Sequence, residues 1–148
     1  MAWYLGIDTS NYTTSVALWE PEKDILVQEK LPLPVRDNAV GLRQSDAVFA
    51  HVKQLGGLIE KVMGQAGSLS AVGVSVRPRD EESSYMPCFL VGEMVAQSIS
   101  AANRISLHRF SHQAGHIAAA LYATMFNHQI KPLLVARLAI YVVGFLIL

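Results

Sequence analysis

Residues 3–19 read WYLGIDTSNYTTSVALW, and this segment decides the fold. Two short apolar runs, 3–7 and 15–19, flank a polar stretch at 8–14. Short apolar runs bounded by glycine or polar residues are typical of buried strands. The segment therefore predicts a β-hairpin with a hydroxyl-rich tip.

The tip of this hairpin has two open interpretations. Backbone N–H groups and hydroxyls in such a turn can bind a phosphate, and Asp8 could hold a divalent cation or a water molecule. The same residue types also form ordinary turns, in which Asp, Asn, Ser and Thr side chains bond to nearby backbone. Residue types alone favour the ordinary turn.

The rest of the chain alternates strand and helix patterns. A third strand is predicted at 25–33 and a loop at 32–44. The clearest helical period begins at Ser45 or Asp46 and runs to Met63, with Gly56-Gly57 indicating close packing or a bend. A strand at 71–76, a helix from Pro87, a strand at 105–110 and a helix at 112–126 complete the pattern.

This order, three strands followed by helix, strand, helix, strand and helix, predicts an α/β fold with a mixed sheet flanked by helices. Ligands of such sheets bind at the carboxyl ends of the strands. The polar turn at 8–14, the charged loop at 77–84 and His112 are expected at that edge.

Composition narrows the class of protein. Hydrophobic residues make up 51% of the 148 residues, enough for the core of one domain or one lobe of a larger one. The formal net charge is zero, so no overall field would attract nucleic acid or an anionic membrane. The chain has a single cysteine, Cys88, which excludes an internal disulfide and is consistent with a reducing cytoplasm. We expect Cys88 to be a small buried apolar residue. The amino terminus has no signal-peptide pattern.

A histidine pair stands in Ser111-His112-Gln113-Ala114-Gly115-His116. Residues four apart lie on one face of a helix, so both imidazoles could bind a single metal ion such as zinc or iron. The alternative is two half-exposed helix histidines without a ligand. No Glu follows the first histidine, so the pattern of a helical metalloprotease site is not present. For His51, a hydrogen-bonded and partly buried side chain is favoured over a metal ligand.

Several segments resemble one known family. Leu5-Gly6-Ile7-Asp8-Thr9-Ser10 and Ser15-Val16-Ala17-Leu18 resemble the opening strand and phosphate-facing turn of the actin, hexokinase and Hsp70 ATPase superfamily, which has an RNase H-like fold. Within it, the resemblance is to the TsaD/Gcp group, once called O-sialoglycoprotein endopeptidases and now understood as tRNA threonylcarbamoyladenosine transferases. It rests on residues 41–55, on 71–76, on Phe89-Leu90-Val91-Gly92, and on 111–116, which resemble the group's Asn-His-x-x-Gly-His segment.

The resemblance implies an amino-terminal lobe over residues 1–132 and specific site residues. His112 and His116 would hold iron or zinc, while Asp8, Thr9, Ser10 and Asn11 would face nucleotide phosphate. ATP or threonylcarbamoyl-adenylate would bind if a second lobe were supplied. The group implies two kinds of partner. One is tRNA, if the chain is active, and the other is a protein subunit, in a homodimer or in a heterodimer with a TsaB-like paralogue. No membrane partner is expected.

The chain also departs from the group. Asn11 to Thr14 replace the usual Cys-Asp-Glu-Thr, and Arg77-Pro78-Arg79-Asp80 replaces Gly-Pro-Gly-Leu. These changes indicate a divergent paralogue whose reaction is open.

The carboxyl-terminal residues carry a separate prediction. Residues 133–138 fit the first strand of the group's second lobe, whereas 139–148 are apolar without any family feature. We expect a truncation or frameshift near residue 138, with a buried or aggregation-prone strand favoured over a membrane segment for 133–148.

Three functions remain open at this point. The chain could be a metal-binding TsaD-like lobe that is weakly active or inactive alone. It could instead be a non-catalytic interaction module of the TsaB type, although that paralogue generally lacks the histidine pair. The third possibility, a metallopeptidase, rests on the old family name and lacks a general base beside the histidines.

Overall fold

The computed structural model describes residues 1–35 and 40–128, with the side chains of 121–128 left out of the description. The predicted α/β class is confirmed, because the elements follow the expected order of three strands, then helix, strand, helix, strand and helix. They are β1 (Trp3–Asp8), β2 (Thr13–Glu20), β3 (Ile25–Pro32), α1 (Gln44–Met63), β4 (Leu69–Arg77), α2 (Phe89–Asn103), β5 (Ser106–Ser111) and α3 (His112–His128).

The strands form one mixed sheet in the order β3-β2-β1-β4-β5. The hairpin predicted from residues 3–19 is present, with β1 antiparallel to β2 and Tyr4 opposite Trp19. In contrast, β4 is parallel to both β1 and β5. The carboxyl ends of β1, β4 and β5 therefore meet at one edge of the sheet, as expected for a ligand-binding edge.

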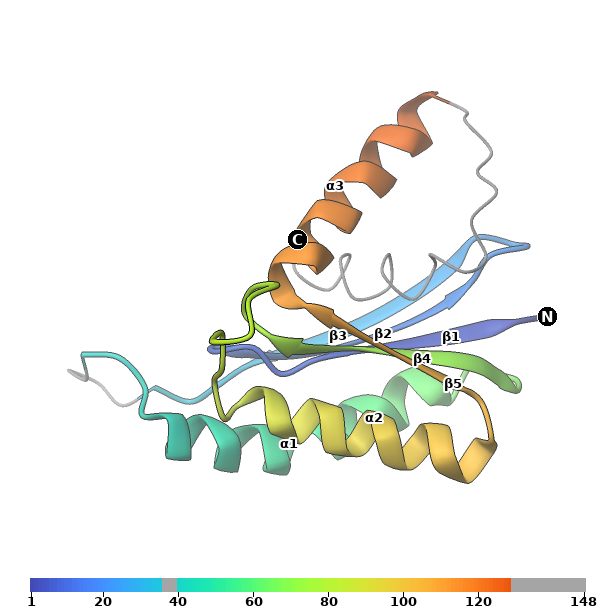
Figure 1. The fold of residues 1–148 in the computed structure, drawn as a ribbon. Coiled ribbons are helices and arrows are strands. Elements are labelled where there is room, and N and C mark those ends of the chain that lie inside the picture. Colours follow the sequence, from blue (N-terminus) through green and yellow to red (C-terminus); the bar gives the residue numbers. More distant parts are fainter. Residues whose placement is uncertain (36–39, 129–148) are drawn as a thin grey trace.

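Helices α1 and α2 cover one face of this sheet, while α3 starts at the carboxyl end of β5 and extends on the opposite side (Figure 1). Because side chains alternate along a strand, Trp3, Leu5 and Ile7 point into the core beneath α1 and α2. Asp8 is the next residue in this alternation. Its side chain consequently lies on the side of the sheet where α3 begins.

Helix α1 runs without interruption through Gly56 and Gly57. Both glycines are exposed, and a Cβ added at either position would meet nothing within 4 Å. The close packing that the sequence indicated there is therefore absent among the described residues. Two exposed glycines in a helix cost about 1 kcal/mol each relative to alanine, and nothing in the described part of the chain offsets that cost.

Two further expectations concern burial and membranes. Cys88 is fully buried, as the sequence predicted. Among the described residues, no helix is both long enough and apolar enough to cross a bilayer. The predictions for residues 133–148 lie outside the described residues.

Candidate metal centre

The first turn of α3 is held against the sheet by two hydrogen bonds. Ser111 caps the helix, since its Oγ accepts a bond of 3.0 Å from the backbone N–H of Ala114. The backbone N–H of the preceding residue, Gln113, donates a bond of 3.0 Å to the carbonyl of Pro78 in the segment after β4. These contacts fix the position from which His112 and His116 extend.

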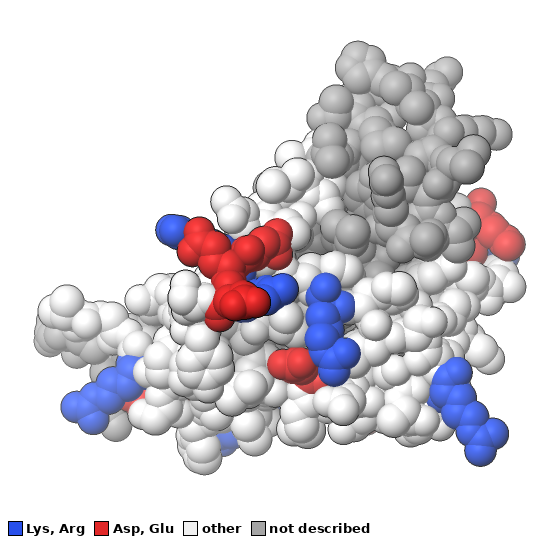
Figure 2. Space-filling view, viewed as in Figure 1, with Lys and Arg blue, Asp and Glu red and all other residues white. Residues whose placement is uncertain are grey.

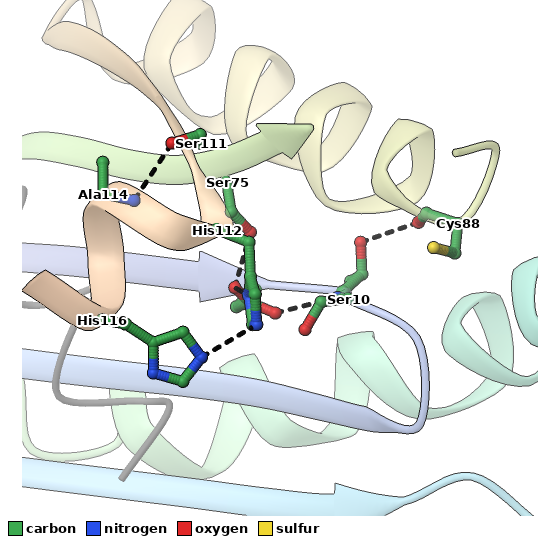
Figure 3. A network of polar contacts seen from close by, with 9 residues as sticks. Ser10, Ser75, Cys88, Ser111, His112, Ala114 and His116 are labelled. Carbon is green, nitrogen blue, oxygen red and sulfur yellow. Dashed lines mark hydrogen bonds and ion pairs between the residues drawn. The ribbon is translucent and has the colours of Figure 1, made fainter. Parts of the chain in front are cut away.

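The Asp8 carboxylate accepts three hydrogen bonds at this edge of the sheet. The three donor residues, Ser10, Ser75 and His112, lie close together in Figure 3. Oδ1 of Asp8 accepts the backbone N–H of Ser10 at 2.8 Å, and Oδ2 accepts the Ser75 hydroxyl at 2.7 Å and the His112 Nδ1–H at 3.0 Å. Burial alone would raise the pKa of Asp8, but the bond and charge of His112, with the bonds from Ser10 and Ser75, lower it below its ordinary value. Asp8 is therefore a buried anion with a fixed orientation.

The two histidines of the predicted pair face each other. Their Nε2 atoms lie 3.1 Å apart, and the rings cross nearly at right angles. In the neutral form of His112 that donates from Nδ1 to Asp8, Nε2 carries a lone pair, which accepts the N–H of His116. Burial, and then the charge of His112, lower the pKa of His116, which favours the neutral form that metals require.

This geometry fits a pair of metal ligands. Two imidazole nitrogens at about 2.1 Å from one zinc ion are about 3.4 Å apart in a tetrahedron and about 3.0 Å apart at neighbouring corners of an octahedron. The observed 3.1 Å separation lies between these values. Metal-bound histidines usually donate their other ring N–H to a carboxylate, which fixes the ring and raises its basicity. Asp8 occupies that position for His112.

The pair would supply two ligands of a metal site, which needs about four. Within the part of the chain that the structure describes, no group of three or more His, Cys, Asp or Glu residues is placed to hold a metal ion. Further ligands would have to be water, a substrate or another polypeptide.

The four candidate phosphate-facing residues, Asp8 to Asn11, lie at the end of β1 and in the turn that follows it, in two different environments. Asp8 and Thr9 are buried, and the Thr9 hydroxyl donates 2.8 Å to the carbonyl of Cys88 and accepts 3.1 Å from the N–H of Gly92. Ser10 and Asn11 are partly exposed. Phosphate binding at this turn stays a prediction, and Ser10 and Asn11 are the residues accessible for it. The hydroxyl of Thr9 instead connects the turn to α2.

His51 belongs to a separate buried network under α1. Its Nδ1 lies 2.8 Å from the Thr14 hydroxyl, which itself donates 2.8 Å to Oε1 of Gln54. The hydroxyl therefore accepts from His51 Nδ1–H, and the Nε2 lone pair has no hydrogen-bond partner among the described residues. The sequence predicted the hydrogen bond, although the side chain is fully rather than partly buried.

Sequence reasoning missed the role of Ser75. Its hydroxyl bonds the same Asp8 oxygen as His112, from the neighbouring strand. The available signal was a serine at the carboxyl end of a valine-rich strand, where an apolar residue would continue the pattern. Which residue lies beside Asp8 depends on the parallel register of β1 and β4, which the sequence does not show.

Comparison with known proteins identifies similar structures. No protein-family model and no curated protein matches the sequence. YeaZ from Pseudomonas aeruginosa is similar with a TM-score of 0.61 and 17% identity, over 84% of this chain and 50% of YeaZ. A second structure, described as an uncharacterized protein with similarity to peptidase YEAZ from Pseudomonas aeruginosa, gives 0.60 and 17%, over 82% and 49%. The chain spans about half the length of these proteins.

The described residues have the actin, hexokinase and Hsp70 fold. This agrees with the fold expected from the opening strand and turn. At 17% identity the similarity concerns the fold alone, and it does not identify the TsaD/Gcp group.

Proposed function

We propose that this chain is a cytoplasmic interaction module of the YeaZ (TsaB) type, which works by binding a protein subunit of the tRNA threonylcarbamoyladenosine system. The similarity to YeaZ over most of the chain supports this proposal over a self-sufficient transferase. The structural observation that carries it is an apolar surface on α1 and α2.

Four large apolar side chains are exposed on these two helices. Phe49 and Val52 on α1 are 65% and 57% exposed, and Leu90 and Met94 on α2 are 50% and 57% exposed. The helices lie side by side on one face of the sheet (Figure 1). Residues other than Lys, Arg, Asp and Glu make up most of the surface over α2 (Figure 2). Apolar groups gathered on one surface, beyond scattered single residues, are typical of protein interaction sites.

The test measures binding of this chain to a purified TsaD-type transferase subunit by sedimentation velocity. We expect a complex that the double variant Phe49→Asp/Leu90→Asp weakens by at least about tenfold, because it places two carboxylates in an apolar contact. Tyr85→Asp is the matched control, since Tyr85 is equally exposed but lies outside both helices. Absence of a complex at about 50 μM of each protein would overturn the proposal.

A second proposal concerns the histidine pair, which the TsaB type generally lacks. We propose that His112 and His116 hold one iron or zinc ion, supported by their 3.1 Å Nε2 separation and by the Asp8 carboxylate behind His112. Such an ion would polarise a carbonyl oxygen as a Lewis acid. Asp8 would keep His112 in the tautomer that presents Nε2. Binding of ATP or threonylcarbamoyl-adenylate, and transfer to tRNA, would require a second lobe, so we expect weak or no transfer by this chain alone.

Elemental analysis of the purified protein tests the metal proposal. We expect near-stoichiometric iron or zinc in the wild type and its loss in both His112→Ala and His116→Ala. His108→Ala is the control, because His108 lies nearby on β5 without belonging to the pair. A folded wild type without metal after exposure to zinc and to ferrous iron would refute the site.

A further inference from the structure

Arg77, the last residue of β4, carries a charge that no other described residue neutralises. Its Nε is buried and has no hydrogen-bond partner among the described residues. The acidic residues that follow it closely in the sequence, 80–82, are exposed and form no ion pair with it. A buried donor without an acceptor destabilises the folded chain, and a ligand that supplies the acceptor removes that cost.

Arg77 lies at the ligand-binding edge of the sheet, next to the start of α3. It pairs with Ser111 across the ladder between β4 and β5, where neighbouring strands are about 5 Å apart, and His112 follows Ser111. Figure 3 shows Ser111 and His112 together at this edge. Val76 packs against the core beneath α1 and α2, so Arg77, the next residue in the alternation, lies on the face where α3 begins.

The Asp8 carboxylate at the same edge is already used by other donors. Its two oxygens accept hydrogen bonds from Ser10, Ser75 and His112, and no contact between Asp8 and Arg77 accompanies these bonds in the described chain. An acceptor for Arg77 therefore has to come from a ligand. The guanidinium is a permanent cation whose planar set of donors matches two oxygens of a phosphate or a carboxylate group.

We propose that Arg77 binds the oxyanion, a phosphate or a carboxylate group, of a ligand that occupies the edge beside the histidine pair. Arg77 is partly exposed, so a ligand from solvent has access to it. It stands where the TsaD/Gcp group has glycine, so this contact distinguishes the chain from that group. Neither proposed function uses Arg77, and the inference goes beyond both.

Calorimetric titration of the metal-free full chain with inorganic pyrophosphate and, separately, with malonate tests anion binding. We expect saturable binding of at least one anion with a Kd below about 5 mM, and the tighter of the two identifies phosphate or carboxylate as the group bound. Arg77→Gln should weaken this binding by at least about tenfold, and Arg77→Lys, which keeps the charge but loses the planar donors, by less. Arg79→Gln is the control, because it removes the same charge from an exposed neighbour and should leave the Kd within about twofold of the wild type.

Thermal unfolding without ligand separates a binding role from a structural one. Arg77→Met keeps an aliphatic side chain and removes the buried unpaired donor, so we expect its unfolding midpoint to rise by about 2–4 °C. Arg109→Met is the control, because Arg109 has an ion-pair partner in Glu93, at 2.8 Å, and its loss should not raise the midpoint.

Three results would overturn the inference. They are a wild type that binds neither anion, equal loss of binding in Arg77→Gln and Arg79→Gln, and a lower unfolding midpoint in Arg77→Met. Each of these would leave the two proposed functions standing, because binding of a protein subunit and metal content are measured independently of Arg77.

Discussion

Acidification should destabilise this protein through one buried histidine. His51 has no exposed surface, and its only hydrogen bond among the described residues joins Nδ1 to the Thr14 hydroxyl at 2.8 Å. Burial lowers the pKa of His51 from 6.5 to about 4, an effect that the negative charge of Asp8 only partly opposes. Protonation of Nε2 would place a charge in the core without a hydrogen-bond acceptor.

The sign of the effect follows from the two pKa values. Above pH 6.5 the imidazole is neutral in both the folded and the unfolded chain, so its contribution to stability is fully present. Between pH 6.5 and 4 the unfolded chain binds a proton that the folded chain does not, and stability falls as the pH falls. At about 1.4 kcal/mol per pH unit, the loss is about 2 kcal/mol by pH 5 and about 3 kcal/mol by pH 4.

The assay is urea unfolding of the wild type and of His51→Gln at pH 7, 5 and 4. Gln does not titrate, and its amide keeps an N–H donor for Thr14. Asp8 and the other carboxylates titrate in both proteins, so their contribution to the pH dependence of stability cancels in the comparison. The wild type should lose about 3 kcal/mol more than the variant between pH 7 and pH 4, a large share of a typical 5–15 kcal/mol. Parallel pH curves, or a His51 titration midpoint near 6.5 by NMR, would refute the reasoning.

Two further predictions concern the turn and the metal pair. Gly92→Ala should lower the free energy of unfolding by about 1–3 kcal/mol, because the added Cβ would lie 2.9 Å from Thr9 Oγ1. Gly57→Ala should instead raise it by up to about 1 kcal/mol, because a Cβ at position 57 meets no atom within 4 Å and alanine favours the helix. Chemical denaturation measures both, and equal effects would contradict the packing argument. Asp8→Asn should weaken zinc binding by about 10- to 100-fold by losing the carboxylate behind His112, as competition with a chelator would show; unchanged affinity would contradict that role.

Much of the fold could be predicted because its elements have clear local patterns. The apolar runs around the polar turn at 8–14 identify β1 and β2, and helical spacing identifies α1 to within a residue or two of its bounds. The strand boundaries differ by up to two residues at an end, as at β4, which runs from Leu69 to Arg77 rather than over 71–76. Pairing with β1 and β5 extends this strand through polar residues that the hydrophobic pattern excludes.

The candidate site could be predicted in part. The expectation that the turn at 8–14 and His112 meet at one edge of the sheet is confirmed by the 3.0 Å contact between Asp8 and His112. Which atoms pair could not be predicted, because it depends on strand register and on the hydrogen bonds that start α3. The same holds for Thr9, which looks like a phosphate contact in the sequence but bonds to the backbone of α2.

The two proposed roles use opposite faces of one sheet. Association would use the outward sides of α1 and α2, whereas the histidine pair lies on the side where α3 begins (Figure 1). Side-chain alternation in β1 produces this separation, because Ile7 packs under the helices and Asp8 points the other way. The double variant Phe49→Asp/Leu90→Asp should therefore weaken binding of a TsaD-type subunit without changing metal content, and His112→Ala should do the reverse. Coupling between the two measurements would point to Thr9, whose hydroxyl joins the turn after Asp8 to the start of α2.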